Sequence, residues 1–229
     1  MGYKINEQGS RCIIVFVKAP KKGFVKTRLA ERIGSAKALM LYQAFVSDIL
    51  SAAARVDADI RIFGHPRGWE QNAPQWTQNI PHVFTQNGAD LGERMANALA
   101  CAAADGYRRT VLIGSDIPEM TESLLEEAFC QLAHHDAVIG PAMDGGYYLV
   151  GFSGSRICRA AFENMTWSGP DVYENTRKRL AQNHNTVYAL QPLADIDTVE
   201  DLRGLASRLA GETRHPFHTR QALVAMQWI

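Results

Sequence analysis

Short apolar runs alternate along this chain with longer segments in which apolar residues recur every three or four positions. The first run, residues 12–17, holds six apolar residues in succession, as is typical of a strand that is buried on both faces. In the segment that follows, residues 35–56, apolar side chains such as Leu41, Phe45 and Ile49 recur at helical spacing. The pattern therefore predicts a buried strand followed by an amphipathic helix.

The same alternation continues along the chain. Further strands are expected over residues 59–63, 83–86, 110–114, 136–140, 147–151 and 186–190, and helices over residues 91–104, 122–133, 170–182 and 199–209. Residues 64–80 are rich in Pro, Gly, Asn and Gln and are expected to form a loop, while residues 211–229 show no interpretable pattern. Strands that alternate with helices of ten or more residues pair in parallel through helical crossovers. The pattern thus predicts an α/β fold with a doubly wound, mostly parallel sheet.

Composition places the chain among ordinary globular proteins. Of its 229 residues, 46% are hydrophobic and 21% are charged, so we expect residues 1–229 to form one domain, with a core at about 11–210. Lys plus Arg and Asp plus Glu balance at 24 each, which excludes the basic footprint of a general nucleic-acid-binding protein. The apolar runs are too short for a signal peptide or a membrane span, and the four cysteines form no CxxC pair. We therefore expect a cytoplasmic protein with free thiols.

Side chains that can carry chemistry follow the ends of several predicted strands. In a doubly wound sheet, ligands bind outside the carboxyl ends of the strands. The stretch "KAPKKGFVKTR", residues 18–28, follows the first strand, and Asp116 follows the strand expected over 110–114. Two further acidic segments, 144–146 and 195–197, follow later strands. We therefore expect these segments to lie at one edge of the sheet.

The stretch 18–28 allows two interpretations, a phosphate-binding loop or a solvated basic turn. Phosphate-binding loops are usually rich in glycine, because backbone N–H groups must approach the anion closely. This loop has one glycine, Gly23, but five cationic side chains in eleven positions: Lys18, Lys21, Lys22, Lys26 and Arg28. If it binds phosphates, the cations must supply the charge.

Asp116 lies in "GSDIPEM", directly after a buried strand. A carboxylate held there by a turn can bind Mg²⁺ or Mn²⁺ while the metal ion holds phosphate oxygens. The alternative is an aspartate that caps the following turn or helix. A second acidic group at the same sheet edge favours the metal site.

The stretch "LADIDTVEDL" carries that second acidic group. Thr198 and Asp201 have the spacing of a capping box and are expected to begin the next helix. Asp195 and Asp197 precede the cap, and we expect them to point in opposite directions, so that only one faces a metal ion. We favour Asp197 for that role.

Two glycine-containing stretches each allow a structural and a functional interpretation. In "GPAMDGGYYLVG", the segment 144–146 is either a tight turn that Asp144 stabilises or a loop against which a bound sugar or acid lies, and both can hold. In "QNGADLGERM", Asp90 is expected to cap a helix with Glu93 three residues later. The dipeptide 91–92 could bring backbone against a flat nucleobase.

Four stretches, taken in order, resemble a bacterial family of GT-A-fold, nucleotide-diphospho-sugar transferase-like proteins. They are "VKAPKKGFVKTRLAERIG", "GADLGERM", "GSDIPEM" with "GPAMDGGYYLVG", and "DIDTVEDL". The similarity runs from about residue 15 to residue 202, and the sequence departs from the pattern at Ala89, where glycine is expected. The wider relatives of this family are 2-phospholactate guanylyltransferase, molybdenum-cofactor guanylyltransferase and CMP-sugar enzymes.

The resemblance implies a role for individual residues. It assigns nucleotide binding to Lys18, Ala19, Pro20, Gly23, Lys26, Arg28, Asp90, Leu91 and Gly92. It assigns substrate binding to Asp144, Gly145, Gly146 and Tyr147. The expected catalytic residues are Lys26, Arg28 and Asp116, and the expected ligands of Mg²⁺ or Mn²⁺ are Asp116 and Asp197.

Three functions remain open. The family resemblance implies a metal-dependent glycosyltransferase that uses a nucleotide-sugar donor and a small-molecule acceptor. The basic loop and the lone Asp116 fit a nucleotidyltransferase that moves NMP from an NTP to a phosphorylated acceptor and releases pyrophosphate. The third possibility is a non-catalytic nucleotide-binding protein, against which the pair Asp116 and Asp197 argues, because binding alone does not require both.

Overall fold

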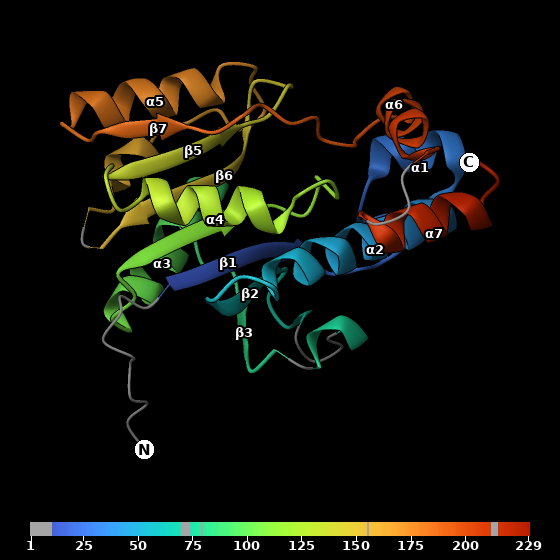
Figure 1. The fold of residues 1–229 in the computed structure, drawn as a ribbon, viewed down its shortest axis with the longest axis horizontal. Helices are drawn as coiled ribbons and strands as arrows, with labels where there is room; N and C mark the ends of the chain where they lie inside the picture. The colour runs from blue at the N-terminus through green and yellow to red at the C-terminus, as the bar shows by residue number, and fades with distance from the viewer. Residues whose placement is uncertain (1–10, 70–73, 79, 155, 212–214) are drawn as a thin grey trace.

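The computed structural model describes residues 11–69, 74–78, 80–154, 156–211 and 215–229. The described residues form a sheet of seven strands in the order β3-β2-β1-β4-β6-β5-β7, with helices on both faces (Figure 1). The strands are β1 (Arg11–Lys18), β2 (Asp59–His65), β3 (His82–Thr85), β4 (Arg109–Ile113), β5 (Ala137–Pro141), β6 (Tyr147–Ser153) and β7 (Val187–Ala189). The α/β fold predicted from the sequence is confirmed.

The helices are α1 (Thr27–Ile33), α2 (Ser35–Ala53), α3 (Leu91–Ala104), α4 (Glu122–Gln131), α5 (Val172–Gln182), α6 (Val199–Leu209) and α7 (Phe217–Ala225). Two short 3₁₀ helices are η2 (Gln75–Thr77) and η3 (Arg159–Ala161). Helices α3 and α6 have the predicted bounds, whereas α1 and α7 were not predicted. Residues 70–73 and 79 of the predicted loop, and 212–214 of the tail, lie outside the described residues. No described helix has the length and apolar character needed to cross a membrane.

The sheet is mostly parallel, as expected, with β6 as the antiparallel strand. It pairs antiparallel with both β4 and β5, while the other strand pairs are parallel. The connection from β5 to β6 is the segment 142–146, which is far too short to form the helical crossover that a parallel pair requires. The short turn therefore reverses the chain and inserts β6 between β4 and β5.

The alternation of side chains along β1 builds a core on each face of the sheet. Ile13 and Val15 pack on one face against α2 and α4. Ile14 and Phe16 pack on the other face against α3 and α5. Because both faces are covered, six successive residues of β1 are buried, and this explains the unbroken apolar run in the sequence.

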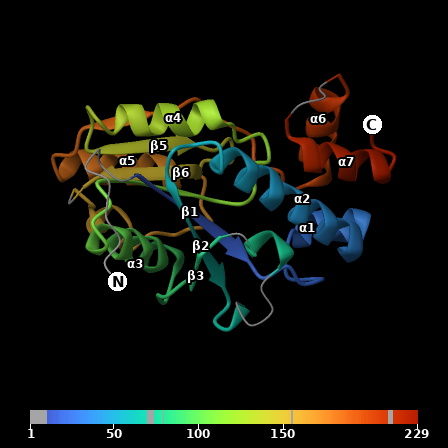
Figure 2. The same ribbon diagram turned by 60° about the horizontal axis from the view of Figure 1, so that its bottom comes forward.

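A third apolar cluster joins α1, α2, α6 and α7 beyond one end of the sheet, at the right of Figures 1 and 2. Helix α7 begins after Pro216, whose side chain has no hydrogen-bond acceptor. The buried Asp48 of α2 supplies the acceptor that the side chain of an N-cap residue usually provides. Its carboxylate accepts hydrogen bonds from the backbone N–H groups of His218 at 2.8 Å and Thr219 at 2.7 Å. An acidic side chain of α2 thus fixes where α7 starts.

Candidate active site

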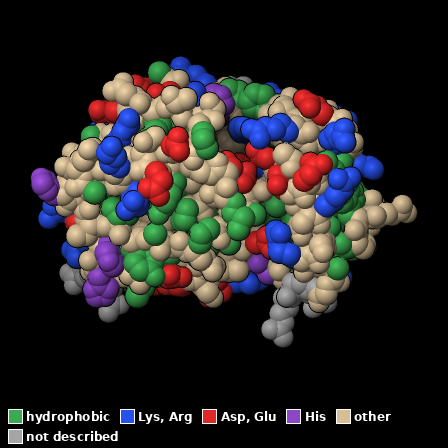
Figure 3. Space-filling view, turned by 90° about the horizontal axis from the view of Figure 1, so that it is seen from above, with side chains coloured by type: hydrophobic (Ala, Val, Ile, Leu, Met, Phe, Trp, Pro, Cys, Tyr) green, Lys and Arg blue, Asp and Glu red, His purple; other side chains and the backbone are tan. Residues whose placement is uncertain are grey.

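A cavity of about 380 Å³ opens at the carboxyl ends of β1 and β4. Its walls come from these strands, from α3, from the turn between β5 and β6, and from the segment before α6. Acidic and basic side chains lie next to each other around a hollow on one face of the molecule (Figure 3). Seven of the residues predicted for the site line this cavity: Lys18, Leu91, Asp116, Asp144, Gly146, Tyr147 and Asp197.

Asp116, Asp144, Asp195 and Asp197 form the acidic wall of the cavity. Lys26 contacts this wall and is almost completely buried, with 2% of its side chain exposed. Its ammonium group forms an ion pair with Asp116 and donates to Oδ1 of Asp197 at 2.9 Å. Burial disfavours the charged lysine, but the two carboxylates outweigh burial and raise the pKa of Lys26. In the same way, burial acts to raise the pKa of Asp116, but Lys26 outweighs it and holds that pKa below its usual value. Lys26 and Asp116 are therefore both charged at neutral pH.

The backbone at Lys26 explains how its side chain reaches this place. Lys26 is the residue before α1 and has φ 49° and ψ 49°, in the left-handed region. A residue with a Cβ seldom adopts this conformation, which costs about 1 kcal/mol or more. The two ion pairs offset that cost. The prediction that Lys26 contacts phosphates stays a prediction, and two of its three N–H donors already bind carboxylates.

The expectation that Asp195 and Asp197 point in opposite directions is wrong, because both line the cavity. Residues two apart in an extended segment share a face, and the residue between them points the other way. That residue is Ile196, which is fully buried among the helices of the third cluster. Its N–H donates to the carbonyl of Asp116, so the segment is held beside the end of β4.

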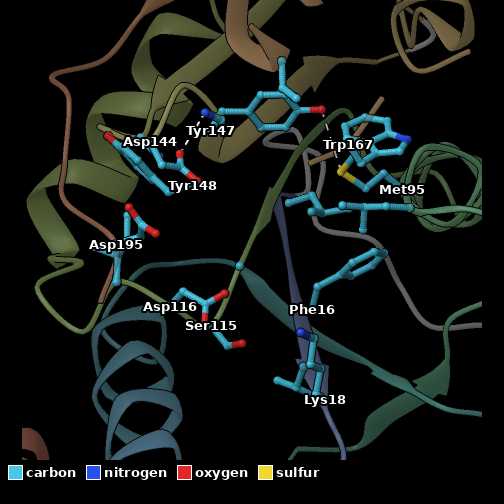
Figure 4. A pocket seen from close by; sticks show the side chains of 18 of the residues that line it. Phe16, Lys18, Met95, Ser115, Asp116, Asp144, Tyr147, Tyr148, Trp167 and Asp195 are labelled. Carbon is cyan, nitrogen blue, oxygen red and sulfur yellow. Dashed lines mark hydrogen bonds between the residues drawn. The ribbon is translucent and has the colours of Figure 1, made fainter. Parts of the chain in front are cut away.

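The acidic wall carries more negative charge than Lys26 neutralises. Burial, together with the nearby carboxylates of Asp144 and Asp197, raises the pKa of Asp195 to about 6. Asp144 lies next to Asp195 on the same side of the cavity (Figure 4). A cation bound here would be stabilised by this surplus of carboxylates.

A basic wall faces these carboxylates and contains a residue that the sequence analysis missed. Lys18 and Arg94 line the cavity. Burial and these two cations lower the pKa of His65, the last residue of β2, which lines the cavity as well. Arg94 stands in the first turns of α3, three residues after Leu91. That helical spacing, which places both residues on one face, was the available signal. Arg28, in contrast, is exposed and does not line the cavity.

Two side chains, the buried Tyr42 and the half-buried Gln86, hold the floor of the site in place. The hydroxyl of Tyr42 in α2 accepts from the N–H of Lys18 at 2.7 Å and donates to its carbonyl at 3.0 Å. The side-chain amide of Gln86 donates to the carbonyls of Phe63 at 3.0 Å and Val17 at 3.3 Å. The basic loop therefore starts from a fixed point at the ends of β1 and β2.

The glycine pair between β5 and β6 has the structural role that was predicted. Asp144 Oδ1 accepts from the N–H of Gly146 at 2.8 Å, which closes the turn. Gly145 has φ +92°, and a Cβ there would lie 1.8 Å from the carbonyl oxygen of Pro170. Asp144 and Gly146 also line the cavity, whereas Gly145 does not. The turn and the cavity wall are thus the same segment.

The start of α3 also has the predicted structure. Asp90 Oδ1 accepts from the N–H of Glu93 at 2.8 Å, and Glu93 in turn accepts from the N–H of Ala89 at 2.8 Å. A Cβ at Gly92 would lie 2.4 Å from the carbonyl oxygen of Phe162 and 2.6 Å from the ring of Trp167. Gly92 therefore allows close packing of α3 on that segment. Ala19, Pro20 and Gly23 belong to the basic loop but do not line the cavity.

The donor set suits a divalent cation that arrives together with phosphate. Within the described part of the chain, no group of three or more His, Cys, Asp or Glu side chains is arranged to hold a metal ion unaided. Mg²⁺ commonly takes one or two protein carboxylates and completes its coordination with water and phosphate oxygens. Asp116 and Asp197 fit that pattern, since their side chains are 50% and 35% exposed although both also bind Lys26.

Comparisons with known proteins agree with this fold. Residues 49–169, just over half of the chain, match the DUF2064 family, described as an uncharacterized protein conserved in bacteria. The crystal structure of a "putative nucleotide-diphospho-sugar transferase" from Desulfovibrio desulfuricans G20 is 39% identical, with a TM-score of 0.90. That similarity covers 96% of each chain. None of the curated proteins matches the sequence.

More distant structures share the fold alone. A cytidylyltransferase from Leptospira borgpetersenii is 15% identical with a TM-score of 0.56, covering 96% of this chain and 94% of that chain. A CMP:2-keto-3-deoxy-manno-octonic acid synthetase complexed with CTP is 11% identical with a TM-score of 0.53. There the similarity covers 89% of this chain and 99% of that chain.

Proposed function

This chain belongs to the bacterial DUF2064 family, which is nucleotide-diphospho-sugar transferase-like, and we propose that this transferase moves a sugar from a nucleotide-sugar donor to a small-molecule acceptor. The observation that carries the proposal is the division of the cavity into a basic and an acidic wall. Lys18 and Arg94 both lie close to His65, whereas Asp116 and Asp197 both bind Lys26. A diphosphate with a divalent cation bound to it matches this distribution of charge.

Each wall contributes to the transfer in its own way. Lys18 and Arg94 donate charge-assisted hydrogen bonds to the diphosphate, which becomes more negative as the bond to the sugar breaks. Asp116 and Asp197 would hold Mg²⁺ or Mn²⁺, which neutralises phosphate charge when bound. Lys26 holds these two carboxylates close together through its two ion pairs. The chain thus positions the donor and stabilises the leaving group.

The turn between β5 and β6 is the proposed acceptor side. Asp144 and Gly146 line the cavity there, next to Asp195. A carboxylate at this place accepts a hydrogen bond from an acceptor hydroxyl and orients it toward the donor. Because Asp144 also closes its own turn, the position of its carboxylate is fixed before the acceptor binds.

A thermal-shift panel tests the proposal. NDP-sugars, NDPs and NTPs are added with Mg²⁺, with Mn²⁺ or with EDTA. At about 100 times Kd a ligand stabilises the native state by about 2.7 kcal/mol, which is visible as a rise in melting temperature. The wild-type protein should show a larger shift with metal than with EDTA, and Asp116→Asn and Asp197→Asn should lose that difference.

A matched control separates loss of the site from loss of stability. Thr121 caps α4 by accepting from the N–H of Leu124 at 3.2 Å, and it does not line the cavity. Thr121→Ala should lower the melting temperature, with a loss of about 1 kcal/mol, but keep the metal-dependent shift. A full metal-dependent shift in Asp116→Asn would place the cation elsewhere and contradict the proposed site.

Nucleotidyl transfer is the second candidate, and one observation favours it. Asp116 is preceded by Ser115 at the end of β4, so this strand end carries one carboxylate where glycosyltransferases commonly carry two aspartates. The products separate the two reactions. A glycosyltransferase releases a nucleoside diphosphate from an NDP-sugar, whereas a nucleotidyltransferase releases pyrophosphate from an NTP and a phosphorylated acceptor. Pyrophosphate release in a screen of NTPs with phosphorylated acids and sugar phosphates would replace the first candidate with the second.

A further inference from the structure

The cavity has an apolar end to which the proposed function assigns no group. Five apolar or aromatic side chains line this end. They are Tyr147 of β6, Met95 of α3, Trp167 of the segment before α5, Phe16 of β1 and Leu112 of β4. Figure 4 shows Tyr147, Trp167, Met95 and Phe16 on one side of the pocket and Asp116, Asp144 and Asp195 on the other. The pocket is therefore amphipathic along its length.

Direct contacts hold the apolar end together. The rings of Tyr147 and Trp167 meet edge to face, with centroids 6.4 Å apart and an angle of 80° between their planes. The hydroxyl of Tyr147 lies 3.9 Å from Sδ of Met95, which is a weak acceptor. The ring of Trp167 packs against the backbone of Gly92, because only a residue without Cβ leaves room for the ring there. The wall is thus fixed before a ligand arrives.

The apolar lining also includes the start of α3. Leu91, which lines the cavity there, is 39% exposed. An exposed apolar side chain in a preformed cavity indicates contact with an apolar part of a ligand.

We infer that the acceptor is an amphipathic alcohol, in which an aryl or bulky alkyl group fills the end formed by Tyr147, Trp167 and Met95. Its hydroxyl then lies toward Asp144 and Asp195, where a carboxylate can accept its hydrogen bond. The role of this alcohol as the acceptor rests on the proposed function. The binding of its apolar group does not depend on that function and can be measured without a nucleotide.

The test uses 2-phenylethanol as the probe, with glycerol and methyl α-D-glucopyranoside as polar comparisons. The four tryptophan indole N–H signals are followed by NMR in the full-length protein with EDTA, and Trp167→Phe assigns the signal of Trp167. The expected result is a saturable shift of the Trp167 signal with 2-phenylethanol, while the signal of Trp76 does not move. Glycerol and the glucoside should leave both signals in place.

Two alanine variants give a matched comparison. Trp167→Ala should weaken the binding of 2-phenylethanol by about fivefold or more, because the probe loses an aromatic contact. Trp76 is also a partly buried tryptophan, but it packs on Trp69 and does not line the cavity. Trp76→Ala should therefore bind the probe as the wild-type protein does. The wild-type NMR titration decides the question even if Trp167→Ala fails to fold.

The outcomes separate this inference from the proposed function. If 2-phenylethanol binds and no nucleotide shifts the melting temperature, the proposed function fails and the apolar site stands. If nucleotides bind and 2-phenylethanol does not move the Trp167 signal, the inference alone is overturned. It is also overturned if the glucoside moves that signal, or if a free nucleoside displaces 2-phenylethanol, because the end would then hold a sugar or a base.

Discussion

Lys26 and Asp197 lie 171 positions apart in the chain and are joined by an ion pair, with Nζ 2.9 Å from Oδ1. Asp116 binds the same ammonium group from the end of β4. One buried lysine thereby connects the basic loop, the central part of the sheet and the segment before α6. The distance between the two candidate metal ligands depends on this lysine.

Lys26→Ala should lower the stability of the metal-free protein. Breaking a fully buried ion pair costs about 3–5 kcal/mol, but both carboxylates are partly exposed and can be rehydrated, so we expect about 1–2 kcal/mol. Mg²⁺ should recover more stability in the variant than in the wild-type protein, because the cation replaces the missing charge. Urea denaturation with EDTA and with Mg²⁺ measures both effects.

Two further variants control for the backbone and for the loss of a positive charge. Lys26→Gly should be more stable than Lys26→Ala by about 1 kcal/mol, since glycine adopts a φ of 49° without strain. Lys22→Ala removes an exposed lysine of the same loop and should leave stability unchanged. Equal stability of Lys26→Ala and the wild-type protein would show that the ion pairs do not hold the site together.

Arg94, rather than Arg28, should dominate phosphate binding. A charge-assisted hydrogen bond contributes about 1.5–3 kcal/mol, so Arg94→Ala should weaken the binding of a nucleoside diphosphate about tenfold or more. Arg28→Ala should change it little, because Arg28 is exposed and does not line the cavity. Calorimetric titration of both variants measures the difference. The reverse ranking would restore the role that the sequence analysis assigned to Arg28.

Asp48→Ala should release α7 from α2. The change leaves the N–H groups of His218 and Thr219 without their acceptor. A buried donor left unpaired, as at Thr219, costs about 1–3 kcal/mol, and the partly buried donor of His218 costs less. We expect a loss of about 2 kcal/mol or more in the free energy of unfolding, together with faster proteolysis of the C-terminal segment. Asp57→Ala, at an exposed aspartate just after α2, is the control and should have neither effect.

Asp136 should stabilise the protein in a pH-dependent way. Its Oδ2 accepts from the backbone N–H of Thr186 at 2.9 Å and from the hydroxyl at 2.8 Å, and these bonds lower the pKa of Asp136 from 3.8. Because the pKa is lowered on folding, the contribution of Asp136 to the free energy of unfolding is complete above pH 3.8. It is lost as the pH falls through the pKa of the folded state.

Asp136→Ala should therefore be less stable than the wild-type protein at pH 7, by about 1 kcal/mol. The difference should disappear at the acidic end of a chemical denaturation series. Asp136→Asn keeps an acceptor that does not titrate, so its stability relative to Asp136→Ala should not vary with pH. A wild-type advantage that persists unchanged into acid would rule out this explanation.

The sequence by itself determined most of the elements and the edge of the sheet at which the candidate site lies. Apolar periodicity is a local property of the chain, and for this reason the strand at residues 12–17 and the helix α3 could be predicted from it. The capping box of Thr198 and Asp201 is also local, and the structure confirms it. Because parallel strands present their carboxyl ends at one edge, the position of Asp116 after a strand was enough to place it at the cavity.

Only the tertiary structure decided which side chains meet at that edge. The burial of Lys26 against Asp197 and the capping of α7 by Asp48 join residues about 170 positions apart, and no local pattern encodes such a pairing. The shared direction of Asp195 and Asp197 depends on where Ile196 finds its core, and Ile196 is buried among α1, α2, α6 and α7. Packing of distant apolar surfaces fixes these positions, and the charges then pair with whatever packing brings within reach.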